Sequence, residues 1–208
     1  MCCSDLILIG AGGHAHACID VIEQHGGFRI AGLVGPPGEP RATHLSYSTI
    51  ATDDDLLKLA SLYKYAIVTV GQIRTPDVRI RLYEEAMRAG FQLPTLISPA
   101  AKVSKHACIG AGTIVMHGAI VNAGAQVGNN CIINTRSLIE HDATVGDHCH
   151  ISTGAILNGA VNVSAGSFVG SASVVKEGVR IGSRCIVGMG AAVHQNLDDG
   201  SKYLGRCN

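Results

Sequence analysis

The chain has 208 residues, in which 16 basic and 16 acidic side chains cancel. A neutral chain offers no positive field to attract a phosphate backbone or an anionic membrane surface, so nucleic acid is not expected as a partner. Hydrophobic residues make up 47% of the chain, yet only 4% is aromatic, tryptophan is absent and there are 26 glycines. This composition favours closely stacked layers of small and aliphatic side chains over a core of large rings.

The N-terminal sequence MCCSDLILIG lacks the basic region and the long apolar run of a secretory signal peptide. No later segment approaches a membrane span of about 18 apolar residues. The eight cysteines include no C-x-x-C pair and are expected to be reduced and buried. We therefore expect a cytoplasmic protein without a membrane span.

Residues 1–95 alternate strand-like and helix-like patterns. Three apolar runs predict strands and three segments with helical spacing predict helices. In chain order these six segments are 6–10, 15–27, 28–34, 52–62, 65–71 and 75–89. Thr52 is the expected N-cap of the second helix, because three aspartates follow it. The order β-α-β-α-β-α predicts a small parallel sheet covered by helices, a half-Rossmann-like α/β domain.

The segment GAGGHA, residues 10–15, follows the first predicted strand and opens the first predicted helix. It fits the G-x-G-x-x-A pattern of phosphate-binding turns, in which the backbone and the free N–H groups of the helix approach an anion. No acidic residue ends the second strand to hold a ribose, so a sugar-nucleotide phosphate is a better ligand than a nicotinamide dinucleotide. Gly12 and Gly13 are candidate substrate-binding residues, with Gly71 after the third strand. A tight turn without a ligand remains the alternative.

From Ile97 onward the sequence repeats with a period of six. Seventeen positions at this spacing, from 97 to 193, all hold Ile, Val or Leu, and the residue four further on is nearly always small. Such a register predicts a parallel β-helix, in which one aliphatic side chain per hexad fills the axis and a small residue lets the chain turn. The general rule for parallel crossovers would give a right-handed coil.

Hexads such as IGAGTI (109–114) and VGNNCI (127–132) resemble those of the hexapeptide-repeat acyltransferases. That resemblance implies a left-handed parallel β-helix with three hexads per coil, which overrules the general preference for the right hand. It also implies trimers with parallel helix axes, in which acyl-CoA lies in the groove between neighbouring subunits. We therefore expect a homotrimer.

The segment SLIEHDATVG, residues 137–146, places three titratable residues together inside this repeat: Glu140, His141 and Asp142. One coil of eighteen residues from His141 lie Ala123 and Gly159, so the sequence leaves room beside the imidazole. An imidazole next to a carboxylate can act as a general base whose protonated form the carboxylate stabilises. Because consecutive strand residues point to opposite faces, a contact with Asp142 requires the triplet to lie at a corner. A solvated corner histidine is the alternative.

The order of features over the whole chain carries a more specific resemblance. A short Rossmann-like half with GAGGHA precedes hexads that contain NTRSLIEHD (134–142) and HCHIS (148–152). This resembles the bacterial family of sialic acid O-acetyltransferases and nucleotide-linked 4-amino-sugar N-acetyltransferases over essentially the full length. It implies a nucleotide-sugar-binding domain at 1–95 and a left-handed β-helix acetyltransferase domain at 96–208. The implied co-substrate is acetyl-CoA, with no metal, and the product would feed O-antigen synthesis.

The resemblance also assigns roles to single residues. It implies that His141 is the catalytic base and that Asp142 is its carboxylate partner. On the substrate side the expected residues are His14, at the sugar-nucleotide end, and Asn134. On the coenzyme side we expect His150, Gly159, Gly188 and Gly190.

The end of the second predicted strand bears on the acceptor. Family members that bind UDP-sugars typically carry an acidic pair there to hold the base, whereas this chain has Val34-Gly35-Pro36. A uridine site is therefore not expected. The nearest resemblance is to members that N-acetylate a GDP-linked 4-amino-4,6-dideoxy sugar, so GDP-perosamine is the favoured acceptor.

Three alternatives stay open at this point. The chain could O-acetylate a free sialic-acid-type sugar, which requires little nucleotide affinity in residues 1–95. It could be a non-catalytic β-helix used for binding, although a scaffold has no need of the cluster at 140–142. The pairs His14-x-His16 and His148-x-His150 could bind zinc, but neither has a cysteine or carboxylate set at the usual spacing.

Overall fold

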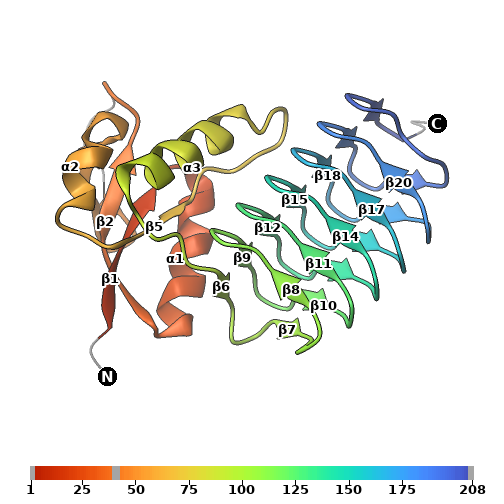
Figure 1. The fold of residues 1–208 in the computed structure, drawn as a ribbon, viewed down its shortest axis with the longest axis horizontal. Helices are drawn as coiled ribbons and strands as arrows, with labels where there is room; N and C mark the ends of the chain where they lie inside the picture. Colours follow the sequence, from red (N-terminus) through yellow and green to blue (C-terminus); the bar gives the residue numbers. More distant parts are fainter. Residues whose placement is uncertain (1–2, 39–42, 206–208) are drawn as a thin grey trace. The chain divides into compact units, whose positions relative to one another are not determined.

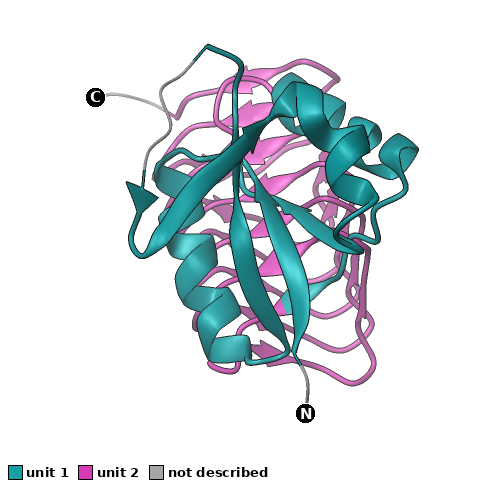
Figure 2. Cartoon of the chain, turned by 90° about the vertical axis from the view of Figure 1, so that its left-hand side faces the viewer, with its two compact units in different colours: residues 1–71, 77–96 teal, residues 72–76, 97–208 magenta. Residues whose placement is uncertain are grey.

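The computed structural model describes residues 3–38 and 43–205 of the chain. These fall into two compact units, coloured separately in Figure 2. The first, here called the α/β unit, comprises Met1–Gly71 and Asp77–Leu96. The second, here called the β-helix unit, comprises Gln72–Pro76 and Ile97–Asn208.

The α/β unit is built on one five-stranded sheet with the strand order β3-β4-β2-β1-β5, of which Figure 1 labels β1, β2 and β5. All neighbours are parallel except β3 and β4, which form an antiparallel hairpin. No helix of the described residues is both long enough and apolar enough to cross a membrane. The elements are β1 (Ser4–Ile9), α1 (Gly13–His25), β2 (Phe28–Gly35), β3 (Thr43–His44), β4 (Tyr47–Thr52), the 3-10 helix η1 (Asp53–Asp55), α2 (Leu56–Ala60), β5 (Tyr65–Val68) and α3 (Asp77–Ala89).

The three predicted strands and three predicted helices of this unit are all present. Strand β1 is fully buried over its four apolar residues, Leu6 to Ile9, as expected for a strand covered on both faces. Helix α1 ends at Gly26, whose left-handed φ of 70° and N–H bond to the Ile22 carbonyl close the last turn. Thr52, expected to cap the second helix, is instead the N-cap of the 3-10 helix η1, where its backbone N–H donates to the Asp55 carboxylate at 3.0 Å; the N-cap of α2 is Asp55.

The sequence did not indicate the hairpin of β3 and β4. Strand β4, with the sequence YSTIAT, has no apolar run, because none of its residues is fully buried. Its register beside β2 comes from the sheet, where Thr49 pairs with Leu33 and Thr52 with Gly35. Long-range pairing here overrides a weak local preference.

The β-helix unit is a left-handed parallel β-helix whose short strands stack into three sheets. Each strand from β6 to β22 ends at one of the seventeen predicted aliphatic positions. The strands are β6 (Leu96–Ile97), β7 (Lys102–Val103), β8 (Cys108–Ile109), β9 (Ile114–Val115), β10 (Ile120–Val121), β11 (Gln126–Val127), β12 (Ile132–Ile133), β13 (Leu138–Ile139), β14 (Thr144–Val145), β15 (His150–Ile151), β16 (Ile156–Leu157), β17 (Asn162–Val163), β18 (Phe168–Val169), β19 (Val174–Val175), β20 (Arg180–Ile181), β21 (Ile186–Val187), β22 (Ala192–Val193) and β23 (Lys202–Tyr203).

The axis of the coil is filled as the hexad pattern predicts. Inward residues such as Ile133, Ile139 and Ile151 are completely buried, and the small residues Ala143 and Cys149 beside them are equally buried. From β7 to β22 the paired strands lie eighteen residues apart, so each inward side chain there packs on its counterpart in the next coil. The core is therefore a set of aliphatic ladders.

Three buried thiols take part in this stacking as hydrogen-bond donors. Cys131, Cys149 and Cys185 each donate to a backbone carbonyl 3.1–3.2 Å away, in Gly146, Ser164 and Asp198 respectively. Burial raises the pKa of the Cys149 thiol well above its usual range, so the thiol stays protonated.

The expectation of buried cysteines is wrong for two other residues. Cys3 and Cys108 are exposed, while Cys2 and Cys207 lie outside the described residues. An exposed position such as Cys108 is tolerated because it points outward from β8, where no axis packing depends on it.

The corners of the coil, defined here as the three residues that follow each strand, place their third residue in the left-handed region. Glycine often occupies this place, for example Gly124 with φ of 77°. Other residues adopt it too, including Asp142 at 59°, His148 at 58° and Ala160 at 55°. The corner geometry itself therefore tolerates side chains.

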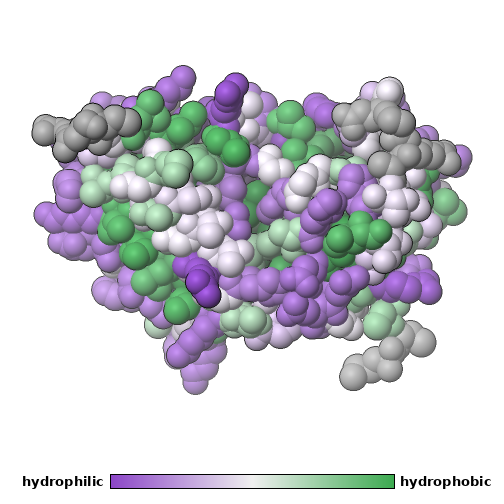
Figure 3. Space-filling view, turned by 180° about the vertical axis from the view of Figure 1, so that it is seen from behind, coloured by the Kyte–Doolittle hydropathy of each residue, from purple (hydrophilic) through white to green (hydrophobic). Residues whose placement is uncertain are grey.

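One outer face of the coil carries a row of apolar side chains, here called the apolar ladder. It runs along β10, β13, β16 and β19, where Ile120, Leu138, Ile156 and Val174 pair in register. Ile120 and Val174 are 37% and 39% exposed. Figure 3, the view from behind, shows hydrophobic side chains reaching the surface of the molecule. Leu138 and Ile156, between them, are half-buried. A partly exposed aliphatic row of this kind is typical of an interaction surface.

Candidate active site

The triplet Glu140, His141 and Asp142 forms the corner that follows β13. The left-handed φ of Asp142, 59°, turns the chain so that neighbouring side chains can meet instead of pointing to opposite faces. The His141 Nδ1 and the Asp142 Oδ2 lie 3.0 Å apart. The sequence predicted a contact between His141 and Asp142 only if the triplet lay at a corner. The triplet does lie at a corner, and the contact is present.

The chemistry of this pair follows from which atoms can donate. An ionised carboxylate only accepts, so Nδ1 of His141 carries the hydrogen and Nε2 is left with a lone pair. The hydrogen bond to Asp142 raises the pKa of His141, and the negative charge of Glu140 adds to this effect. With 66% of its side chain exposed, His141 can present Nε2 to a bound molecule.

Space beside the imidazole is provided by Gly159, one coil further along. A Cβ at this position would lie 2.7 Å from both Cε1 and Nε2 of His141, so a side chain here would displace the ring from its present position. A groove of about 740 Å³ opens here. Its lining residues are Glu140, His141, Asn158, Gly159, Ala160, Glu177 and Gly178.

Glu140 is held from the coil on the other side. Its Oε2 accepts hydrogen bonds from the Asn122 side chain at 2.9 Å and from the His141 backbone N–H at 3.2 Å. The carboxylate thus fixes the start of the corner. Its geometry makes it a support for His141 and not a second partner of the ring.

A second polar group lies on another sheet of the coil, at β15. His150 is buried, with Nδ1 at 2.6 Å from the Gln72 carbonyl oxygen and Nε2 at 3.0 Å from the Asn134 side chain. A carbonyl only accepts, so Nδ1 donates and Nε2 accepts from the Asn134 amide. Phe168 packs edge-on against the ring, with the ring centroids 5.2 Å apart.

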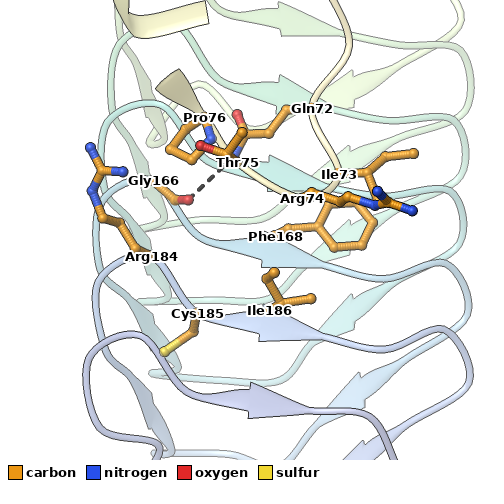
Figure 4. A pocket seen from close by; sticks show the side chains of 10 residues that line it. All are labelled: Gln72, Ile73, Arg74, Thr75, Pro76, Gly166, Phe168, Arg184, Cys185 and Ile186. Atoms are coloured by element: carbon orange, nitrogen blue, oxygen red, sulfur yellow. Dashed lines mark hydrogen bonds between the residues drawn. The ribbon is translucent and has the colours of Figure 1, made fainter. Parts of the chain in front are cut away.

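His150 therefore holds the segment Gln72–Pro76 against the coil. Figure 4 shows this segment beside Phe168 and Arg184, with a hydrogen bond from the Gln72 side chain to the Gly166 carbonyl at 3.3 Å. A small cavity of about 70 Å³ lies among these residues. The guanidinium groups of Arg74 and Arg184 point away from one another (Figure 4).

The glycine turn of the α/β unit lies between β1 and α1. The helix begins at Gly13 with Gly12 as its N-cap, and a Cβ on either glycine would meet no atom within 4 Å. Open space in front of a helix N-terminus suits an anion. Gly71 lies at the same place, because a Cβ there would be 3.4 Å from the Cβ of His14.

Comparison with protein families gives three matches. Residues 5–86 match the PglD N-terminal domain, residues 124–159 the six-repeat bacterial transferase hexapeptide family and residues 162–195 the hexapeptide repeat of succinyl-transferase. No curated protein sequence matches significantly.

Solved structures give similarities over nearly the whole length. A histidine-to-asparagine variant of perosamine N-acetyltransferase from Caulobacter crescentus, in complex with CoA and GDP-perosamine, is 31% identical with a TM-score of 0.89, covering 96% of this chain and 92% of that chain. The acetyltransferase domain of PglB from Neisseria gonorrhoeae FA1090, in complex with acetyl coenzyme A, is 30% identical with a TM-score of 0.88, covering 97% and 96%. This chain belongs to the family of hexapeptide-repeat sugar acetyltransferases. WeeI from Acinetobacter baumannii AYE shares the fold at 20% identity and a TM-score of 0.84, covering 96% and 95%.

The structure of this acetyltransferase groups the expected site residues into three places. His141, Asp142 and Gly159 meet at one corner. Asn134 meets His150 on another sheet, although the sequence placed them on opposite sides of the reaction. The third place is the glycine turn, with Gly12, Gly13, His14 and Gly71.

The remaining expectations for the acetyltransferase concern its coenzyme residues. His150 is not among the described residues that line the groove of His141 and Gly159. Gly188 and Gly190 lie at the corner after β21, where a Cβ on Gly188 would be 2.9 Å from the Leu204 carbonyl oxygen. Across residues 3–38 and 43–205, no group of three or more His, Cys, Asp or Glu side chains could hold a metal ion.

Sequence reasoning missed two residues of these sites. Glu177 lines the groove and lies two coils of eighteen residues from His141, so the same stepping that found Gly159 would have found it. Gln72 accepts the His150 hydrogen bond across 78 residues of sequence, and no periodic signal marks it.

Proposed function

We propose that this acetyltransferase moves the acetyl group of acetyl-CoA to the 4-amino group of a nucleotide-linked 4-amino-4,6-dideoxy sugar, with GDP-perosamine as the acceptor. The observation that carries the proposal is the His141–Asp142 pair, whose free Nε2 faces an open groove beside Gly159. The relatives add support, because they were crystallised with CoA and GDP-perosamine or with acetyl coenzyme A. Acetyl-CoA is the co-substrate.

In this proposal His141 acts as a general base. Its Nε2 takes a proton from the sugar amine as the amine nitrogen bonds to the thioester carbonyl carbon, and Asp142 stabilises the imidazolium that forms. The bond between that carbon and sulfur then breaks, and the proton passes from Nε2 to the departing thiolate. Two substrates held side by side need no acyl-enzyme, because their positioning already removes much of the entropic barrier.

The groove fits a long flexible donor. Gly159, Ala160 and Gly178 leave its floor without bulky side chains, and it continues over two coils from His141 to Glu177. A pantetheine arm could lie along such a floor with its thioester beside Nε2. In this proposal His150, held by the Gln72 carbonyl and the Asn134 amide, belongs to the coenzyme side, and Asn134 belongs to the substrate side.

The glycine turn is the proposed diphosphate site. Gly12 and Gly13 leave the N-terminus of α1 open, and Gly71 and His14 lie against one another beside it. Strand β2 ends with Val34 and Gly35, neither of which carries a carboxylate that could bind a uracil. This favours GDP over UDP.

The apolar ladder supports a homotrimer. Leu138 lies in β13, three residues before His141, so a second copy of the chain packed on this ladder would lie beside the groove. Burial of four aliphatic side chains per subunit would favour such packing. Gly188 and Gly190 of a neighbouring copy could then reach the donor. Because acetyl-CoA and nucleotide sugars are cytoplasmic metabolites, the proposed reaction belongs in the cytoplasm, ahead of O-antigen assembly.

The proposal is tested by supplying acetyl-CoA with either GDP-perosamine or a free sialic-acid-type sugar and following thiol release. Acetylation of GDP-perosamine is the expected result. Calorimetric titration with GDP, UDP and coenzyme A separately should show binding of GDP and coenzyme A but not of UDP. Acetylation of the free sugar alone, without nucleotide binding, would instead support an O-acetyltransferase.

A further inference from the structure

The coil that precedes the His141 corner carries a glycine directly under Asp142. The two residues are eighteen apart, and the Asp142 backbone N–H donates to the carbonyl of Ala123, next to Gly124. A Cβ built on Gly124 would collide with the Asp142 Oδ1 and lie 3.3 Å from its Cγ. The Asp142 carboxylate therefore occupies the space that a side chain at 124 would fill.

Backbone geometry alone does not explain this glycine. Gly124 has φ of 77°, in the left-handed region, but the same corner place in the next two coils holds Asp142 at 59° and Ala160 at 55°. Two residues with a Cβ therefore adopt this conformation within the same stack. What distinguishes position 124 is the carboxylate beside it.

The pair is thus enclosed by glycines from both neighbouring coils. On one side, the His141 ring occupies the space that a side chain at Gly159 would fill. On the other side, the Asp142 carboxylate occupies the space that a side chain at Gly124 would fill. Both missing side chains favour the arrangement in which the carboxylate lies 3.0 Å from Nδ1.

We propose that Gly124 is a positioning residue for the acetyl transfer: its missing side chain leaves the notch that keeps the Asp142 carboxylate on Nδ1 of His141. The inference rests on the proposed function, in which His141 is the base. Gly124 is not among the described residues that line the groove of His141, and it acts through Asp142.

The contact that a side chain at 124 would create is with the far end of a flexible side chain. Asp142 can relieve it by rotating about its own bonds, and it is 70% exposed, so water can receive the carboxylate. The rotation would break the bond to His141 and leave the coil in place. Gly124→Ala should therefore act on the imidazole more than on the fold.

Three carboxylates face His141, and they set what a titration will show. Asp142 bonds the ring, Glu140 precedes it in the corner, and Glu177 lines the same groove. Displacing the Asp142 carboxylate removes its hydrogen bond and leaves the other two in place. The pKa of His141 should then fall toward the value in Asp142→Asn.

The experiment is an NMR titration of His141 in the full-length protein without substrates, in the wild type and in Gly124→Ala, with the His141→Asn spectrum to assign the signal. The matched control is Gly154→Ala, because Gly154 has a comparable φ of 65° and its Cβ would meet nothing within 4 Å. Gly124→Ala should lower the pKa of His141 and move the acid limb of kcat/KM to lower pH. Gly154→Ala should leave both unchanged.

A second variant guards against loss of the fold. Gly124→Asn also adds a Cβ, but asparagine accepts left-handed φ, as Asn130 does at 51° in a corner of this coil. In the Asp142→Asn background, Gly124→Ala should produce no further shift. An unchanged His141 titration in either single variant, or an equal shift in Gly154→Ala, would overturn the inference.

The outcomes also separate this inference from the proposed function. If Gly124→Ala shifts the titration but His141→Asn keeps near-normal turnover, the notch exists and the assignment of the base is wrong. If His141→Asn abolishes turnover and Gly124→Ala leaves the titration unchanged, the base stands and the notch has no positioning role.

Discussion

In the β-helix unit the candidate site is made by side chains standing on a corner, whereas in the α/β unit the candidate phosphate site is made by the backbone. His141 and Asp142 occupy places that other coils give to Gly159, Ala160 or Gly178 without disturbing the coil. At the glycine turn, Gly12 and Gly13 matter because they carry no side chain. One site should therefore be lost by removing atoms and the other by adding them.

The hydrophobic cores of the two units also differ, in how many elements share each core. Inward residues of the coil, such as Ile133, pack on counterparts eighteen residues away, so each coil depends on its two neighbours. In the α/β unit, β1 lies between β2 and β5 and shares a core with α2 and α3. A truncation should therefore disturb only the neighbouring coils in the first case and the whole unit in the second.

The largest effect is expected from His141→Asn. Asparagine fills a similar space but cannot take up a proton, so acetyl transfer should fall by about 10²–10⁴-fold, the usual contribution of a general base. Steady-state rates of thiol release from acetyl-CoA measure this. Circular dichroism should show an unchanged coil, because the corner accepts small residues in its place.

The control for this variant is His194→Asn. His194 is exposed and follows β22 at the corner, as Glu140 follows β13. It should retain wild-type turnover. Near-normal turnover of His141→Asn, or equal losses of turnover in both variants, would contradict the assignment of His141 as the general base.

Core truncation should give the next largest effect and should sharpen the comparison of the two units. Ile133→Ala and Ile7→Ala each remove a completely buried side chain, and each should cost about 2–5 kcal/mol of unfolding free energy. Hydrogen exchange should distinguish them. Lost protection should stay within the coils next to Ile133, but should extend over the whole sheet for Ile7. The same spread in both variants would contradict the stacked description.

Much of the coil could be predicted because its signal is repeated. Ile133 is inward for the same reason as sixteen other aliphatic residues, and the room beside His141 follows from one step of eighteen to Gly159. The C-cap at Gly26 and the N-cap at Thr52 were also predictable, because each depends on neighbouring residues in the sequence. Each of these features depends on residues close in sequence or on a fixed period.

What the sequence could not show depends on contacts without a period. Gln72 meets His150 across 78 residues, so the support of that histidine was invisible. The role of Gly124 depends on where the Asp142 carboxylate points, which is a side-chain conformation. Strand β4 forms through its partner β2 and not through its own polar sequence.

A smaller effect, about 1–3 kcal/mol from strained backbone, is expected for Gly10→Ala in the glycine turn. Gly10 has φ of 123°, and its Cβ would lie 2.8 Å from the backbone nitrogen of Val70. Denaturant unfolding measures the loss. Gly12→Ala is the matched variant, since its Cβ meets open space: it should keep stability but weaken GDP binding. If Gly10→Ala and Gly12→Ala lost equal stability, the proposal that the backbone at Gly12 forms the phosphate site would be contradicted.

The smallest effect is expected for Asp142→Asn, and it is a shift of the pH profile in a defined direction. Asparagine tolerates the left-handed φ of 59°, so the corner should persist while the charge is lost. Asp142 raises the pKa of His141, and removing it lowers that pKa, so the acid limb of kcat/KM should move to lower pH. The maximal rate should also fall, by less than in His141→Asn, because the imidazolium loses its partner.

The raised pKa of His141 also makes the stability of the fold depend on pH. Because the pKa of His141 is higher in the folded chain than its ordinary value, the ion pair stabilises the fold below about pH 6.5. That contribution disappears as the pH rises through the folded-state pKa. In Asp142→Asn the difference in stability from the wild type should therefore be present at pH 5 and absent at pH 9. A difference that is the same at both pH values would mean that Asp142 supports the corner by packing and not by its charge on His141.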